Sequence, residues 1–166
     1  MPIIKKHSYW ILVIIWACFI FFMSNMDTYE SNTKSKATTN ILIESTLKAT
    51  NKLGIKKRNS NKIKRKEVIN KFNKPLRKIA HATEYCILSI LTIIALTKSG
   101  LKEKKAIIIS LLISIIYACS DEYHQTFING RTGQFNDVLI DMLGFIIGLI
   151  IYTIIEKKLK YNKKMV

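Results

Sequence analysis

The 166-residue chain has few acidic residues: 11 Asp and Glu stand against 27 Lys and Arg, for a formal net charge of +16. It also has only two prolines, six glycines and three cysteines. Cys18, Cys86 and Cys119 each lie inside an apolar run. An odd number of cysteines in such surroundings argues against a disulfide framework. We interpret them as small apolar packing residues.

The sequence also lacks the usual motifs for a metal, a cofactor or an activated nucleophile, and it shows no internal repeat. Ser120 lies near His124, but no Gly-x-Ser-x-Gly elbow surrounds it. No His-Glu-x-x-His spacing is present. A metal site is conceivable from His81, Glu84, Glu122, His124 and Asp141, although no recognised spacing supports it. We therefore predict neither a metal nor a cofactor.

Long apolar runs determine the expected class of protein. In a soluble protein, this basic surplus would suggest binding to nucleic acid. Here 49% of the residues are hydrophobic, and many of them form uninterrupted blocks. The sequence therefore predicts a membrane protein that binds no nucleic acid. The positive charge then favours anionic lipid head groups, at roughly 1 kcal/mol per Lys or Arg near the surface.

Four apolar runs predict an all-α, polytopic transmembrane helical bundle in a single domain, residues 1–166. The predicted spans are about 8–23, 79–97, 106–122 and 138–155. The third run is short for a bilayer, which needs about 20 residues, unless the helix continues through Ser120–Tyr123. That continuation would bring Asp121 and Glu122 to the membrane edge. No small-x-small cleavage site follows the first span, so we expect a retained anchor.

A basic connection, residues 24–78, separates the first two spans and is too long for a simple turn. Apolar residues recur at helical spacing in 41–55 and in 68–79, which predicts two amphipathic helices. The second should lead into the next span, with a kink or a fresh start at Pro75. Lys-rich helices with apolar stripes are typical of membrane surfaces. The alternative is a disordered basic loop over 24–65.

The distribution of Lys and Arg predicts the orientation in the membrane. Of the two shortest connections, residues 98–105 carry four Lys, whereas residues 120–136 carry one Arg and two acids. The long connection is also basic, but long loops cross largely regardless of charge. We expect a multi-pass protein of the cell membrane with both termini cytoplasmic and residues 120–136 outside.

Polar side chains gather at the ends of the last three predicted spans, where hydrocarbon cannot solvate them. The candidate site residues are His81, Glu84, Tyr85, Asp121, Glu122, His124, Gln125, Arg131, Asp137 and Asp141. Asn129-Gly130 predicts a turn that lets Arg131 fold back over the acidic pair. Asn136 or Asp137 is placed to cap the fourth span.

The fourth span carries small residues on the face of its buried acid. Gly144 and Gly148 follow Asp141 at helical spacing and form Gly-x-x-x-Gly. Small residues let helices approach closely in membranes. We therefore expect this face to press into the bundle and to carry Asp141 toward the other polar groups.

The pattern of these residues resembles the VanZ-like family of bacterial membrane proteins. The match consists of Arg77-Lys78-x-x-His81-x-x-x-Tyr85, then Asp121-Glu122-x-His124-Gln125-x-Phe127-x-x-Gly130-Arg131, then Asp137, Asp141, Gly144 and Gly148. The resemblance implies an integral bundle of several helices, and it implies no particular enzymatic activity. The name-giving member is associated with resistance to teicoplanin, a lipid-bearing glycopeptide antibiotic, in Gram-positive bacteria. Asp141 stands where many members are expected to carry Asn.

The leading hypothesis is a polar site at the outer membrane face that binds an amphiphilic envelope molecule. Candidates are phospholipid heads, lipid-linked cell-wall precursors and lipoglycopeptides. Arg131 would hold an anionic group through a forked contact. Glu122, His124 and Gln125 would bind the remaining polar atoms. His81, Glu84 and Asp141 would support these residues. Tyr85 and Asp137 are further candidates for ligand binding.

Three alternatives stay open. In an enzyme, a lipid-head hydrolase or transferase, Glu122 or Asp121 would act as general base and His124 as its partner acid. In a proton- or ion-coupled carrier, Glu84 and Asp141 would act as relay carboxylates. In a scaffold, the polar cluster would serve helix packing alone. The sequence predicts no oligomeric state.

Overall fold

The computed structural model describes residues 3–26, 28–52, 62–131 and 133–165. These residues form five helices and no strand, so the all-α prediction is confirmed for them. The helices are α1 (Ile3–Ser24), α2 (Thr28–Lys52), α3 (Lys62–Lys98), α4 (Glu103–Gln125) and α5 (Phe135–Lys164).

Three helices are individually long and apolar enough to cross a membrane. They are α3 over Ile69–Lys98, α4 over its whole length and α5 over Phe135–Asn162. A fourth crossing is obtained if Ser8–Ser24 and Tyr29–Thr46 are taken together as one bent span. The fold therefore has the predicted multi-span character, with three or four crossings. The helix of the third predicted span does continue past Ser120 and ends at Gln125.

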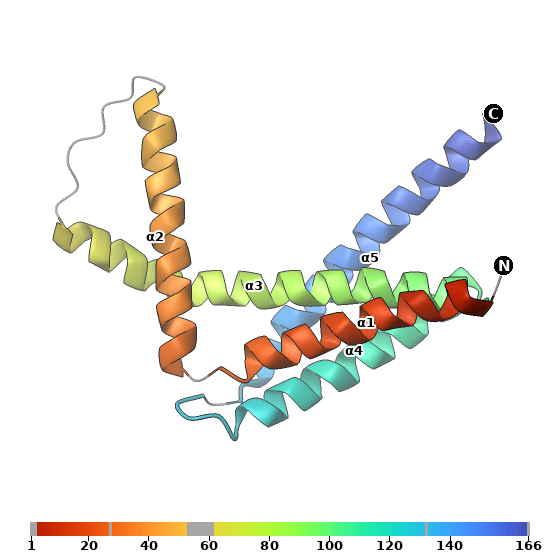
Figure 1. Ribbon diagram of the computed structural model, residues 1–166, viewed down its shortest axis with the longest axis horizontal. Coiled ribbons are helices and arrows are strands. Elements are labelled where there is room, and N and C mark those ends of the chain that lie inside the picture. Colours follow the sequence, from red (N-terminus) through yellow and green to blue (C-terminus); the bar gives the residue numbers. More distant parts are fainter. Residues whose placement is uncertain (1–2, 27, 53–61, 132, 166) are drawn as a thin grey trace.

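Helix α3 is the centre of the bundle. It packs against all four other helices, and its contact with α5 is the most extensive. Figure 1 shows α1 and α4 lying alongside α3 and running opposite to it, while α5 crosses α3 obliquely. Helix α1 begins and α5 ends on the same side of the bundle, opposite the bend between α1 and α2 (Figure 1).

Two glycines allow α5 to cross α3 closely. A Cβ added at Gly144 would collide with the backbone carbonyl oxygen of Ala82 and lie 2.9 Å from its Cα. A Cβ added at Gly148 would collide with the Ser89 hydroxyl and the Cys86 carbonyl oxygen. Since backbone cannot move aside as a side chain can, the crossing requires small residues here.

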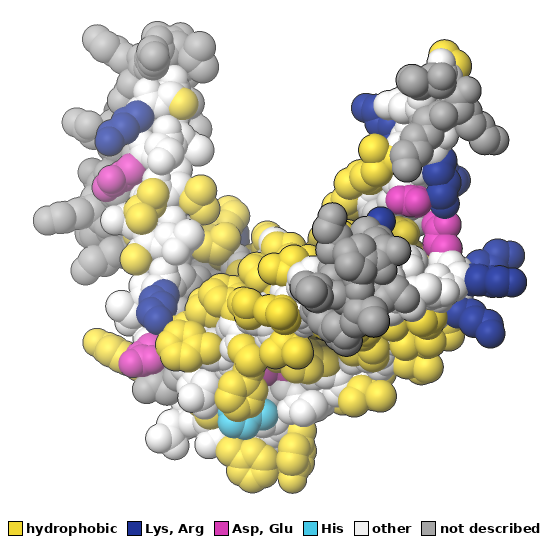
Figure 2. Space-filling view, turned by 45° about the vertical axis from the view of Figure 1, so that its right-hand side comes forward, with side chains coloured by type: hydrophobic (Ala, Val, Ile, Leu, Met, Phe, Trp, Pro, Cys, Tyr) yellow, Lys and Arg dark blue, Asp and Glu magenta, His cyan; other side chains and the backbone are white. Residues whose placement is uncertain are grey.

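The outer surface of the bundle is apolar. Large hydrophobic side chains that are exposed include Phe22, Ile79, Ile116, Ile147 and Ile154, which come from four helices. Figure 2 shows hydrophobic side chains across the body of the molecule, whereas the Lys and Arg side chains in view lie mainly on its two arms and at one end. An apolar surface of this extent fits contact with lipid rather than water.

The long first connection is mainly helical. Helix α2 occupies residues 28–52, so the disordered-loop alternative is wrong for this part, and residues 53–61 lie outside the described chain. Helix α3 begins at Lys62 and continues through Pro75, so the predicted fresh start there is wrong. Pro75 removes one helical hydrogen bond without ending the helix. Figure 1 shows the first turns of α3 inclined to the remainder.

Helix α2 lies across the end of the bundle. The axes of Ser8–Ser24 and Tyr29–Thr46 form an angle of 103°. Asn73 of α3 holds α2 by two hydrogen bonds: its Nδ2 donates to Asn32 Oδ1 at 2.9 Å, and its carbonyl accepts from Ser35 Oγ at 3.2 Å. Helix α2 therefore lies at about a right angle to α1. If α1 crosses the membrane, α2 runs along the membrane surface, which is the orientation of an interfacial helix.

Candidate functional site

A cavity of about 260 Å³ lies where the bend between α1 and α2 meets α3. We call it the bend cavity. Its lining residues are Met23, Met26, Ser31, Lys34, Ser35, Thr38, Leu76, Arg77, Ile79, Ala80, His81, Glu84 and Arg131. The bend, α2, α3 and the connection between α4 and α5 all contribute, so segments far apart in the sequence build one site.

The bend cavity carries three cationic side chains, Lys34, Arg77 and Arg131. Among the residues that the structure describes, neither arginine side chain forms an ion pair or a hydrogen bond. The Nε of Arg131 is buried without a partner. Burial lowers the pKa of Arg131 and Arg77 lowers it further, while Asp121, Glu122 and Glu84 raise it. The cavity therefore holds positive charge that no direct contact neutralises.

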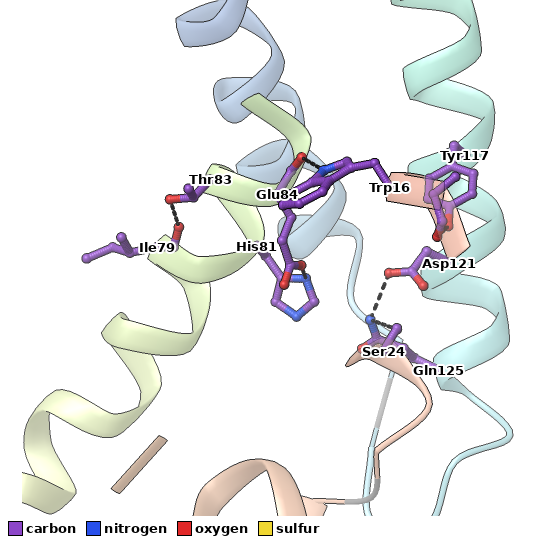
Figure 3. Close-up of polar contacts among 10 residues, drawn as sticks. Trp16, Ser24, Ile79, His81, Thr83, Glu84, Tyr117, Asp121 and Gln125 are labelled. Atoms are coloured by element: carbon purple, nitrogen blue, oxygen red, sulfur yellow. Dashed lines mark hydrogen bonds and ion pairs between the residues drawn. The ribbon is translucent and has the colours of Figure 1, made fainter. Parts of the chain in front are cut away.

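A histidine and a carboxylate face the bend cavity from one turn of α3. His81 Nδ1 lies 3.5 Å from Glu84 Oε2. Trp16 of α1 donates its indole N–H to the backbone carbonyl of Glu84 at 2.9 Å. Figure 3 shows both side chains on the same stretch of α3, with Trp16 reaching toward it from α1. These contacts fix the orientation of this turn beside the cavity.

A second, much smaller cavity of about 20 Å³ shares Arg77 and His81 with the first. A space of this size holds roughly one water molecule. Its other lining residues are Lys78, Glu122, Gln125, Asp137, Ile140 and Asp141. The two cavities therefore adjoin at Arg77 and His81.

Two side chains of α4 tie its end to other segments. Gln125 Nε2 donates to Ser24 Oγ at 2.9 Å and to Asp121 Oδ2 at 3.2 Å (Figure 3). Glu122 Oε1 accepts the backbone N–H of Gln134 at 2.7 Å. Gln125 therefore joins α4 to the end of α1, and Glu122 joins it to the residue that precedes α5.

The acids of α5 have different surroundings. Asp137 Oδ1 pairs with Lys78 Nζ at 2.7 Å. Gln134 is the residue at the N-cap position and makes no side-chain capping bond, so the prediction that Asn136 or Asp137 caps this helix is wrong. Asp141 is only 2% exposed, and its Oδ1 has no hydrogen-bond partner within the described chain.

The structure distributes the sequence-predicted site residues over four places. Arg131, His81 and Glu84 line the bend cavity, whereas Glu122, Gln125, Asp137 and Asp141 line the small cavity beside it. Tyr85 and Asp121 are buried in the core. His124 lines neither cavity; its ring stacks on Phe21 at 4.7 Å, and its Nε2 lies 3.2 Å from Asn25 Oδ1.

Sequence reasoning missed the residues that the bend contributes. Lys34 was counted only among the basic residues of the long connection, and Met23 and Met26 carried no signal. Arg77 and Lys78 were part of the matched motif but received no role. Their proximity to Arg131 depends on the tertiary arrangement, which no local pattern predicts.

No group of three or more His, Cys, Asp or Glu side chains in the described segments is arranged to hold a metal ion.

The fold and the site together define a helical membrane protein with a cationic cavity at one end of its bundle. A family model described as VanZ/LLP1 matches residues 9–156, which is most of the chain. The chain therefore belongs to the VanZ-like family, as its motifs indicated. No curated protein and no solved structure matches it.

Proposed function

We propose that this protein binds the anionic head group of an amphiphilic envelope molecule in the bend cavity. One observation carries the proposal: Arg77 and Arg131 line the same cavity, and neither is paired with a carboxylate of the described chain. Two neighbouring guanidinium groups repel each other, and an anion placed between them removes that repulsion. Guanidinium groups bind phosphate and carboxylate through two parallel hydrogen bonds.

The apolar part of the bend cavity supports an amphiphilic ligand rather than a free ion. Met23 and Leu76 line it, together with Ile79, which is 61% exposed on the surface of α3. An acyl or prenyl chain could lie against this surface while its head occupies the cavity. Phospholipids, lipid-linked wall precursors and lipid-bearing glycopeptides share this combination of an anionic head and an apolar tail.

The proposed setting is the outer face of the cell membrane, with both termini in the cytoplasm. The dense Lys content of residues 98–105, at the opposite end from the site, supports this orientation. In this setting, a ligand such as teicoplanin or a wall precursor would meet the cavity from outside. A role in glycopeptide tolerance would follow from capture of one of them.

Binding is favoured over catalysis because the predicted acid–base pair shares no cavity. Glu122 lines the small cavity and accepts a hydrogen bond from Gln134, whereas His124 stacks on Phe21. A hydrolase or transferase remains the alternative, and turnover of a lipid-linked substrate by purified protein would establish it.

The proposal is tested by lipid binding to the purified full-length chain, followed by native mass spectrometry. The probes are phosphatidylglycerol, which is anionic, and phosphatidylcholine, which is not. The Arg77→Ala/Arg131→Ala double variant should bind phosphatidylglycerol at least about tenfold more weakly, because truncating a desolvated charge contact costs about 2 kcal/mol or more. Binding of phosphatidylcholine should change little.

Lys104→Ala/Lys105→Ala is the matched control, since both residues are exposed cations at the other end of the bundle. It removes two positive charges, as the arginine variant does, without touching the cavity, and it should bind as the wild type does. Equal binding by the arginine variant and the wild type, with both folded by circular dichroism, would refute the proposal.

A further inference from the structure

The buried face of α4 consists of small and polar side chains over its whole length. These are Ala106, Ser110, Ser114, Ala118, Asp121, Glu122 and Gln125. Small residues at four-residue spacing let membrane helices approach closely, which accounts for the size of these side chains. Close packing needs only alanine or glycine, so it does not account for the hydroxyl groups.

The hydroxyls of Ser110 and Ser114 differ from those of Ser89 and Thr92 in that they have no hydrogen-bond partner within the described chain. Both serines are 0% exposed, and neither Oγ has a hydrogen-bond partner in the described chain. By contrast, Ser89 and Thr92 of α3 bond to carbonyls of their own helix at 2.8 and 2.7 Å. A buried hydroxyl without a partner costs about 1–3 kcal/mol, and internal water commonly supplies the partner.

Buried polar atoms without hydrogen-bond partners also occur at the end of α4 that lies beside the small cavity. Asp121 Oδ1, Asp141 Oδ1 and the Tyr85 hydroxyl are buried without hydrogen-bond partners among the described residues, and the two acids are 4% and 2% exposed. Within the described chain, no ion pair neutralises either acid, and no group of His, Cys, Asp and Glu side chains is arranged to bind a metal. A carboxyl group can accept a proton on one oxygen and release a proton from the other, so it can take part in a relay.

A cavity of about 230 Å³ lies at the opposite end of the bundle. Thr97, Glu103, Tyr152 and Lys160 line it, and Lys160 Nζ lies 2.9 Å from Glu103 Oε2. Along α4, about 16 Å of helix separates Asp121 from Ser110, and about 10 Å separates Ser110 from Glu103. Polar groups therefore recur along the core from the site end to this far cavity.

We propose that the core between α3, α4 and α5 conducts protons between the two ends of the bundle. Asp141 exchanges protons with the small cavity, which it lines. The side chains of Asp121, Tyr85, Ser114 and Ser110 pass them on through intervening water to the far cavity. Each hydroxyl oxygen accepts one proton and releases its own, so it is unchanged after the transfer. One proton moves down its electrochemical gradient, and no other reactant is needed.

The test uses the full-length chain in liposomes that contain a pH-sensitive dye. A potassium gradient with valinomycin sets the membrane potential, and the rate of internal acidification is measured. Wild-type liposomes should acidify faster than protein-free liposomes. The Ser110→Ala/Ser114→Ala variant should acidify about tenfold more slowly than the wild type, since it lacks two relay hydrogen bonds. Alanine keeps the small size, so close helix packing is retained.

Ser120→Ala is the matched control, because Ser120 is an exposed serine on the same helix. It should conduct as the wild type does. Should the double variant fail to fold, Asp141→Asn provides the same test, because the amide keeps the shape and cannot release a proton. Wild-type liposomes no faster than protein-free ones, or folded relay variants as fast as the wild type, would overturn the proposal.

The proposed proton pathway and the proposed anion binding can be tested independently, because they use different residues. Lys34→Ala changes the bend cavity only, so it should weaken phosphatidylglycerol binding and leave proton flux unchanged. Loss of flux in this variant would show that the flux does not run through the core.

Discussion

At the scale of single residues, the contact between α3 and α5 depends on Gly144. Gly144→Ala should lower the free energy of unfolding by about 1–3 kcal/mol, the usual cost of overpacking. The added Cβ would overlap the backbone of Ala82, so the two helices would have to separate. Thermal unfolding in detergent measures the effect.

Leu143→Ala is the control, since Leu143 is adjacent in sequence and 57% exposed on the outer surface of α5. It should unfold close to the wild-type temperature. A Gly144→Ala variant that unfolds no earlier than Leu143→Ala would contradict the close crossing.

The sequence was enough to predict that a polar site exists and which residues belong near it. It was not enough to predict the role of each residue. His81, Glu84 and Arg131 stood out because charged groups are rare at the ends of apolar runs. The sequence made His124 a ligand contact and His81 a supporting residue, whereas the structure places His81 on the bend cavity and His124 against Phe21. Which histidine faces a cavity depends on how each helix is rotated in the bundle, and spacing within one helix does not specify that.

At the scale of elements, Asn73 of α3 forms two hydrogen bonds to α2. Asn73→Ala should loosen α2, because the bond to Asn32 is lost. One such hydrogen bond contributes about 1 kcal/mol, so amides of α2 should exchange with solvent deuterium about fivefold faster. Hydrogen exchange with mass spectrometry measures this.

Amides of α4 serve as the internal reference for that experiment, because α4 does not contact α2. Their exchange should be unchanged in Asn73→Ala. Equal acceleration in α2 and α4 would show a global loss of stability instead of a local release.

The apolar runs predicted where α3, α4 and α5 lie, because long hydrophobic stretches form helices in a membrane whatever their neighbours. They did not predict the 103° bend between α1 and α2, or the passage of α3 through Pro75. The bend places α2 against Asn73 of α3, a contact between segments far apart in the sequence. Tertiary contacts of this kind leave no periodic signal.

At the scale of the whole molecule, the arrangement predicts that the two ends of the bundle lie on opposite sides of the membrane. In a variant without Cys18, Cys86 and Cys119, a single cysteine is introduced by Asn129→Cys or by Asn162→Cys. A membrane-impermeant thiol reagent should label Asn129→Cys in intact cells and label Asn162→Cys only after lysis. Labelling of both variants in intact cells would contradict this topology.

The proposed binding of an anionic head group by Arg77 and Arg131 can be tested by photocrosslinking. A phosphatidic acid probe with a photoreactive acyl chain is reconstituted with the full chain, and the crosslinked peptides are mapped by mass spectrometry. We expect adducts near Met23, Leu76 and Ile79. The Arg77→Ala/Arg131→Ala variant should form fewer of them, and an equivalent phosphatidylcholine probe should form none. Adducts spread evenly over the exposed apolar surface, alike for both probes and both proteins, would refute binding in the bend cavity.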